Sequence, residues 1–200
     1  MPVKIKPLTK KQLREVFESY SDVFAHWDKD VSAATFARTS GPVKQQVWFE
    51  GLRSGEYRPA SGVRIRVAPD VAMLHQFLDI RHRQILHSQH EAMQPSVIAA
   101  MTTQFMPHLN QPLDAAEVLR LCEAEATNNI SDICGVAALA AYLGRSNLAL
   151  EWCKKAEASM ARLGRQPAEW ELSQHDFVKQ LDLALRSNAE AAFLKKFMVS

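Results

Sequence analysis

The spacing of hydrophobic positions changes along the chain, from helical to alternating and back to helical. Near the N-terminus, Thr9 is a typical helix N-cap residue. After it, apolar residues recur at helical spacing, namely Leu13, Val16, Phe17 and Tyr20. This pattern predicts an amphipathic helix that begins just after Thr9.

Residues 35–67 contain segments that alternate with a period of two, which is typical of strands with one packed and one solvated face. The segment 35–39 is short and β-prone, and Gly41-Pro42 is a turn signal. Residues 43–50 alternate, and so do residues 63–67. The stretch 54–62, which contains Pro59, predicts a looser connection. The sequence therefore predicts three antiparallel strands in a meander, with helices on the apolar face.

From Pro69 onward the pattern predicts helices to the end of the chain. Asp70 can cap a helix over 71–78, which continues or restarts over 79–93. Further helices are expected over 95–105, 115–126, 130–143, 147–163 and 167–185, with Asn188 interrupting the last one. The predicted fold class is α+β, with a mainly helical C-terminal two-thirds built of α-hairpins. Residues 1–106 form the expected α+β region and residues 113–200 the helical-hairpin region, with one continuous domain as the alternative.

The composition is that of a globular protein, with 47% hydrophobic and 23% charged residues in 200. The net charge is only +2, so the chain lacks the strong basic character typical of nucleic-acid binding. The positive charge is concentrated early: residues 1–66 hold 12 Lys and Arg against 7 Asp and Glu, and residues 67–200 hold 12 against 15. This bias favours a protein partner with an acidic surface.

Several functional signatures are missing from the sequence. We find no secretory signal, membrane-spanning run or CxxC pair, and the three cysteines lie in helical patterns. A Gly-rich phosphate loop, a GxSxG elbow and an HExxH motif are also absent. We therefore expect a cytoplasmic protein that is not an enzyme and carries no cofactor.

Two stretches resemble known families. Within residues 130–160, Ala137, Ala149 and Ala156 stand 12 and then 7 residues apart, with Gly144 at the turn. This spacing resembles a single tetratricopeptide repeat, whose small residues let two helices cross closely. Ala161 occupies the usual proline position of that family, and no second repeat adjoins it, so the resemblance implies one α-hairpin.

The second resemblance covers residues 36–67. Its matching residues are Phe36, Arg38, Gln46, Gly55, Tyr57, Arg58 and Pro59. They resemble the small β-meander of an uncharacterised bacterial domain group that is associated with immunity to secreted toxins. The resemblance implies a binding role and no catalytic chemistry.

Basic and aromatic side chains in the meander form the candidate binding surface. Arg64 and Arg66 share the polar face of the third strand, and Arg is suited to bidentate contact with carboxylate or phosphate. Tyr57 and Arg58 are expected in a loop beside the sheet, because Pro59 biases Arg58 to an extended conformation. The predicted partner-binding residues are Arg38, Trp48, Tyr57, Arg58, Arg64 and Arg66, with Lys44 as a neighbour.

These residues predict a non-enzymatic protein-binding module, of the kind that neutralises a toxin by occlusion. One alternative is an enzyme or metal-binding protein, because four histidines fall between His75 and His90. In that alternative His75, Asp79 and His82 are the best ligand trio. The other alternative is a helical homodimer with an exposed apolar face on the C-terminal helices. That face consists of Leu181, Leu185, Phe193 and Phe197.

Overall fold

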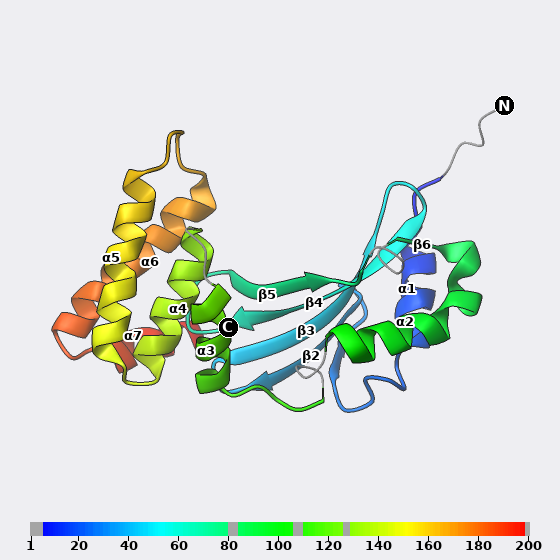
Figure 1. The fold of residues 1–200 in the computed structure, drawn as a ribbon, viewed down its shortest axis with the longest axis horizontal. Coiled ribbons are helices and arrows are strands. Elements are labelled where there is room, and N and C mark those ends of the chain that lie inside the picture. Colours follow the sequence, from blue (N-terminus) through cyan, green and yellow to red (C-terminus); the bar gives the residue numbers. More distant parts are fainter. Residues whose placement is uncertain (1–5, 80–83, 106–109, 126–128, 199–200) are drawn as a thin grey trace. The chain divides into compact units, whose positions relative to one another are not determined.

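The computed structural model describes residues 6–79, 84–105, 110–125 and 129–198, which form an α+β fold (Figure 1). The helices are α1 (Lys10–Ser19), a 3-10 turn η1 (His87–Gln89), α2 (His90–Gln104), α3 (Ala115–Glu125), α4 (Ile130–Tyr142), α5 (Ser146–Ala161), α6 (Glu169–Arg186) and α7 (Glu190–Met198). The strands are β1 (Asp28–Asp30), β2 (Thr35–Ser40), β3 (Val43–Gly51), β4 (Glu56–Ile65), β5 (Val71–Phe77) and β6 (Ile85–Leu86). The predicted fold class is confirmed.

The sheet has the strand order β1-β2-β3-β4-β5, and β6 pairs with β4. β1 is antiparallel to β2, with Lys29 opposite Phe36, and β6 is antiparallel to β4, with Ile85 opposite Tyr57. The sequence therefore predicted too few strands, three where the described sheet has six. The predicted connection over 54–62 was also wrong in part, because β4 runs through Pro59.

The largest difference from the sequence prediction lies at residues 71–78. Val71, Leu74 and Phe77 are spaced like one face of a helix, but they lie in strand β5. Leu74 has a φ of +52°, in the left-handed region that interrupts a regular strand. Before Leu74 the buried residues Val71 and Met73 alternate with exposed Ala72, and after Leu74 this alternation of buried and exposed positions does not continue. The apolar residues of β5 are therefore spaced as in a helix.

Two compact units share the chain, and each takes residues from several stretches. Unit 1 consists of residues 1–38, 45–62 and 75–112, and unit 2 of residues 39–44, 63–74 and 113–200. The division at 106–113 that we expected from the sequence stays a prediction.

The core of unit 1 is aromatic. Phe17 of α1 stacks on Phe36 of β2 with ring centroids 4.3 Å apart, and Phe24 stacks on the same ring at 4.7 Å. Tyr20 stacks on Phe49 of β3 at 4.7 Å. Offset stacks of this kind add about 0.5–1.5 kcal/mol each to the stabilisation from burial. The predicted helix after Thr9 is confirmed and a capping box between Thr9 and Gln12 starts it; α1 supplies Phe17, and Tyr20 and Phe24 follow its end.

Unit 2 is built around α4, which contacts α3, α5, α6 and α7. A helix that is apolar on every side belongs in a core, and every residue from Ile133 to Ala141 is buried. Gly135 lies in this helix because a β-carbon there would stand 2.9 Å from Val71 Cγ1 and 2.2 Å from Met73 Sδ. The glycine therefore allows a close approach between α4 and the first part of β5.

The predicted hairpin of α4 and α5 is present, and Gly144 ends α4 with a φ of +70°. Ala137, Ala149 and Ala156 are fully buried, as close packing of two helices requires. The three cysteines are buried, and none of them forms a disulfide. No helix among the residues in the four described ranges is long and apolar enough to cross a bilayer.

Candidate functional site

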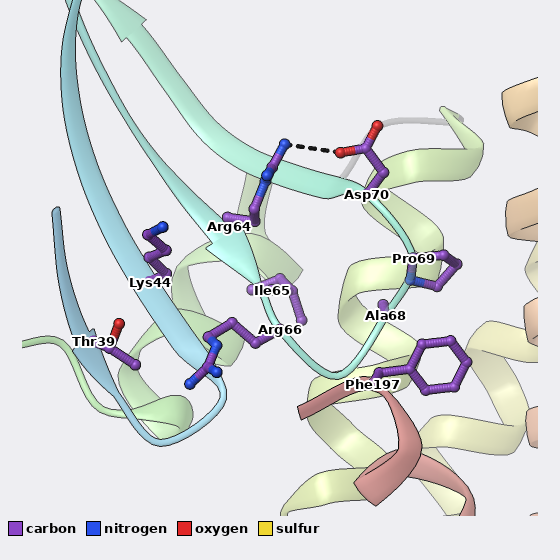
Figure 2. Close-up of a pocket in the computed structure, with 9 residues that line it drawn as sticks. All are labelled: Thr39, Lys44, Arg64, Ile65, Arg66, Ala68, Pro69, Asp70 and Phe197. Atoms are coloured by element: carbon purple, nitrogen blue, oxygen red, sulfur yellow. Dashed lines mark hydrogen bonds and ion pairs between the residues drawn. The ribbon is translucent and has the colours of Figure 1, made fainter. Parts of the chain in front are cut away.

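The candidate site is a pocket of about 610 Å³ in unit 2 (Figure 2). Polar side chains come from Thr39, Lys44, Arg64, Arg66 and Asp70, and apolar surface comes from Ile65, Ala68, Pro69 and Phe197. A volume of this size lies in the range typical of small-ligand sites. The pocket holds three cationic side chains and one carboxylate.

Arg64 and Arg66 reach the pocket because of the alternation at the end of β4. Ile65 between them is buried in the core of unit 2, so the two arginines project to the opposite side. Arg64 donates a hydrogen bond from Nη2 to Asp70 Oδ1 at 2.8 Å, which Figure 2 shows as a dashed line. The side chains of Arg64 and Asp70 are 50% and 81% exposed, so water screens this ion pair and it is easily exchanged.

Asp70 has a backbone φ of +47°, in the left-handed region. Aspartate adopts this region more readily than most residues because its short side chain bonds locally. Gln174 of α6 donates from Nε2 to the Asp70 carbonyl at 3.4 Å. The turn between β4 and β5 therefore holds Asp70 at the rim of the pocket.

Arg66 connects the pocket to the end of α7. Its Nη2 donates to the carbonyl oxygen of Met198 at 2.9 Å, where the helix leaves a carbonyl without a helical partner. The neighbouring ring of Phe197 is half-buried and packs edge-on against Phe177, at 5.0 Å between centroids. The hydrogen bond to Met198 uses one N–H of Arg66 and leaves its other N–H donors available to a ligand in the pocket.

Lys44 and Thr39 come from the hairpin formed by β2 and β3. Lys44 is half-buried, and it makes no ion pair with any residue that the structure describes. The sequence identified Lys44, Arg64 and Arg66 as neighbours, and the structure brings these three together. It missed Thr39, Asp70 and Phe197, which reach the pocket only through the fold.

Arg38 belongs to unit 1. Its guanidinium covers the ring of Trp27 at 4.6 Å, and its Nε donates to Gln45 Oε1 at 2.9 Å. A further bond runs from its Nη2 to the Gln111 carbonyl oxygen. Partial burial lowers the pKa of Arg38 from its usual value. These contacts hold the side chain in place along its own unit.

Trp48 and Arg58 are neighbours on the sheet in unit 1, and both bond to Glu50. Trp48 donates from Nε1 to Glu50 Oε1 at 3.0 Å, and Arg58 pairs with Glu50 Oε2 at 2.6 Å. Burial by itself raises the pKa of Glu50, but these two hydrogen bonds together with the charges of Arg58 and His75 outweigh burial, and the pKa lies below its usual value. The His75 ring lies against the Trp48 ring, with centroids 4.9 Å apart. The Arg58 guanidinium lies over the Phe77 ring, 4.1 Å from its centroid. The charge of Arg58 is therefore neutralised within the unit.

Tyr57 was predicted in a loop beside the sheet, and that prediction is wrong. It lies in β4 and is fully buried. Its hydroxyl stands 2.8 Å from His90 Nδ1 and 3.2 Å from the hydroxyl of Tyr20. Burial raises the pKa of Tyr57 to about 12. This side chain contributes to the core of unit 1.

The hydrogen bonds around His90 have one consistent direction. The hydroxyl of Ser19 donates to the Val16 carbonyl at 2.7 Å, so it accepts from His90 Nε2 at 2.9 Å. We infer that His90 carries its proton on Nε2 and accepts at Nδ1 from Tyr57, which accepts from Tyr20. In this arrangement every proton in the chain has an acceptor. Ser19 is not activated as a nucleophile, because its proton points away from the imidazole.

The predicted trio His75, Asp79 and His82 does not have the helical arrangement on which it depended. His75 lies in β5, where its ring packs against Phe77 at 4.5 Å. His82 lies outside the described residues. Within the described ranges, no group of three or more His, Cys, Asp or Glu side chains is placed to hold a metal ion.

The apolar face that favoured a homodimer is not exposed. Leu181, Leu185 and Phe193 are at most 8% exposed, because they pack into the core of unit 2. The exposed apolar residues of α6 are others, namely Trp170, Leu172 and Leu183.

The chain was compared with protein-family models, with curated proteins and with solved structures, and none of them matches. The resemblances to an immunity-type meander and to a tetratricopeptide repeat therefore stay predictions.

Proposed function

We propose that this chain is a non-enzymatic, cytoplasmic protein-binding module that uses the pocket of unit 2 to contact an acidic protein partner. The observation that carries the proposal is the gathering of Lys44, Arg64 and Arg66 from two segments of the chain around one pocket. Like charges repel, so three cations with a single carboxylate among them are stabilised by an anion from outside.

The burial of the other candidate residues narrows the contact surface. Tyr57 is fully buried, and Arg58 is paired with Glu50, so we assign neither to the partner contact. Arg38 is held by Trp27 and Gln45. Of the candidate cations, this leaves Lys44, Arg64 and Arg66 for the contact with a partner.

The likeness of residues 36–67 to an immunity-type meander favours a toxin as the partner. Such a protein acts by occlusion, which requires a stable complex and no reaction. Complementary charge would speed the encounter and make it sensitive to salt. A partner with carboxylates around its own functional site fits this chemistry.

The test compares two versions of the chain as affinity baits in lysate of the native organism. One carries Arg64→Gln and Arg66→Gln, and the matched control carries Arg53→Gln and Arg145→Gln, two exposed arginines that line no described pocket. Both variants lose two positive charges. We expect the control to retain a stoichiometric protein partner. The pocket variant should capture at least about tenfold less of that partner, as for a lost charged contact. Equal capture by both variants, with both shown to be folded by thermal melting, would reject the pocket as the contact.

A further inference from the structure

The charge of the pocket indicates how much negative charge its ligand brings. Lys44, Arg64 and Arg66 are positive and Asp70 is negative, so the described lining carries a net charge of +2. A ligand with two carboxylates matches this charge. A nucleic acid carries one negative charge for about every 1.7 Å of duplex and needs a long basic track, which a single pocket beside Asp70 does not offer.

The donors that remain free indicate where the carboxylates bind. Arg66 spends one N–H on the Met198 carbonyl and keeps others for a bidentate contact. Lys44 makes no ion pair within the described part of the chain. Arg64 is already occupied by Asp70. Lys44 and Arg66 are therefore the primary anion-binding pair, and Arg64 is a secondary one.

Part of the pocket lining is apolar. Ala68 and Pro69 come from the turn between β4 and β5, and the Phe197 ring comes from α7 (Figure 2). A ligand that carried only charge would leave this surface in contact with water. An apolar side chain next to the carboxylates would remove that surface from water and add to the affinity.

We infer that the pocket binds a short acidic segment of a protein, with two carboxylates on Lys44 and Arg66 and an adjacent apolar side chain against Pro69 and Phe197. The inference rests on the proposed function and specifies the partner chemistry at the same site. It assigns recognition to a linear sequence feature, two acidic residues followed by an apolar one, and not to acidity alone.

The test uses three blocked tripeptides and nitrogen-15 NMR of the full chain. The probes are Glu-Asp-Leu, its amide analogue Gln-Asn-Leu, and Glu-Asp-Ser, each acetylated and amidated. We expect Glu-Asp-Leu to shift the Arg66 Nε–H and Phe197 amide signals with a dissociation constant of about 1 mM, which is reasonable for so small a ligand. The amide analogue should bind at least about tenfold more weakly, because it lacks the charge-assisted hydrogen bonds. The serine analogue should bind about fivefold more weakly, because it buries less apolar surface.

A protein variant provides a second readout that does not depend on removing a contact. Asp70→Asn keeps a residue that tolerates positive φ but removes the carboxylate, which frees Arg64 and raises the net charge of the lining. We expect this variant to bind Glu-Asp-Leu about threefold more tightly at low salt, in line with a screened surface pair.

Several outcomes would overturn the inference. The first is that about 10 mM Glu-Asp-Leu, far above the expected dissociation constant, shifts no signal. The second is that the amide or the serine analogue binds as tightly as Glu-Asp-Leu. The third is that a uridine decanucleotide or inorganic phosphate binds more tightly to the same residues. Failure of the peptides while the affinity test still depends on Arg64 and Arg66 would reject only the ligand chemistry. If the peptides bind as expected but capture of a partner in the affinity test does not depend on Arg64 and Arg66, only the proposed function is rejected.

Discussion

Replacing Tyr57 by Phe separates a structural role of this residue from the partner-binding role that the sequence predicts for it. The substitution removes one hydroxyl from the centre of the buried chain that joins Tyr20 to His90. The ring stays, so the apolar packing of β4 is preserved. Any loss of stability therefore comes from the hydrogen bonds.

The magnitude follows from the groups that lose a partner. A neutral hydrogen bond stabilises a folded protein by about 1 kcal/mol net, and a buried group left without one costs about 1–3 kcal/mol. Here the hydroxyl proton of Tyr20 and the Nδ1 lone pair of His90 both lose their partner. Removing the Tyr57 hydroxyl also removes its own desolvation cost, which offsets part of this. We expect a loss of about 2–3 kcal/mol in the free energy of unfolding.

The assay is urea unfolding at neutral pH, followed by thermal melting. A chain of this length should melt about 2–4 °C lower for each kcal/mol lost. Tyr142→Phe is the matched control, because Tyr142 is 39% exposed and no described residue bonds to its hydroxyl. The control should lie within about 0.5 kcal/mol of the wild type. Equal stability of the two variants would refute the hydrogen-bond chain, and a loss of partner binding without a loss of stability would return Tyr57 to the contact surface.

Three further predictions concern other parts of the two cores. Burial, and to a smaller extent the charge of His87, lower the pKa of His90 in the folded state. The folded protein therefore favours neutral His90, and this contribution to stability is present above the unfolded pKa of about 6.5 and is lost as the pH falls below it. Urea titrations between pH 7.5 and 5 should show a smaller decrease for His90→Asn than for the wild type, and His26→Asn, at an exposed position, should leave the wild-type decrease unchanged. Gly135→Ala should destabilise by about 1–2 kcal/mol, because overpacking against the rigid Val71 side chain exceeds the gain of up to about 1 kcal/mol in helix propensity; a more stable variant would show that β5 can yield. The three buried thiols should react with Ellman's reagent only after unfolding, since burial raises the pKa of Cys153 to about 12, and a fast thiol in the native protein would contradict this.

Features that depend on near neighbours in the sequence were predicted well. The start of α1 depends on Thr9 and Gln12, which lie three residues apart and bond to each other. Asn129 caps α4, and Gly144 ends it in the left-handed conformation that glycine adopts without strain. Caps and turns of this kind follow from local chemistry, so the helices of the C-terminal half were located to within a few residues.

Periodicity failed where the backbone departs from a regular element. The positive φ at Leu74 shifts the phase of β5 and makes it imitate a helix. Pro59 looks like a strand breaker but lies within β4. A period can be read only while the backbone stays regular, so spacing predicted the end of β4 after Gly62 but neither its first part nor β5.

The amino-acid sequence by itself determined the fold class, the approximate ends of the helices after residue 113 and the basic character of the segment that carries Arg64 and Arg66. Only the tertiary structure decided which candidates are buried and which face a pocket. Tyr57 and Arg64 belong to the same strand, yet one is fully buried and the other is half exposed. Arg66 bonds to Met198, 132 residues away, and no local pattern encodes that contact. The physical reason is that caps and turns depend on a few adjacent residues, whereas a pocket depends on how distant segments pack their apolar sides together.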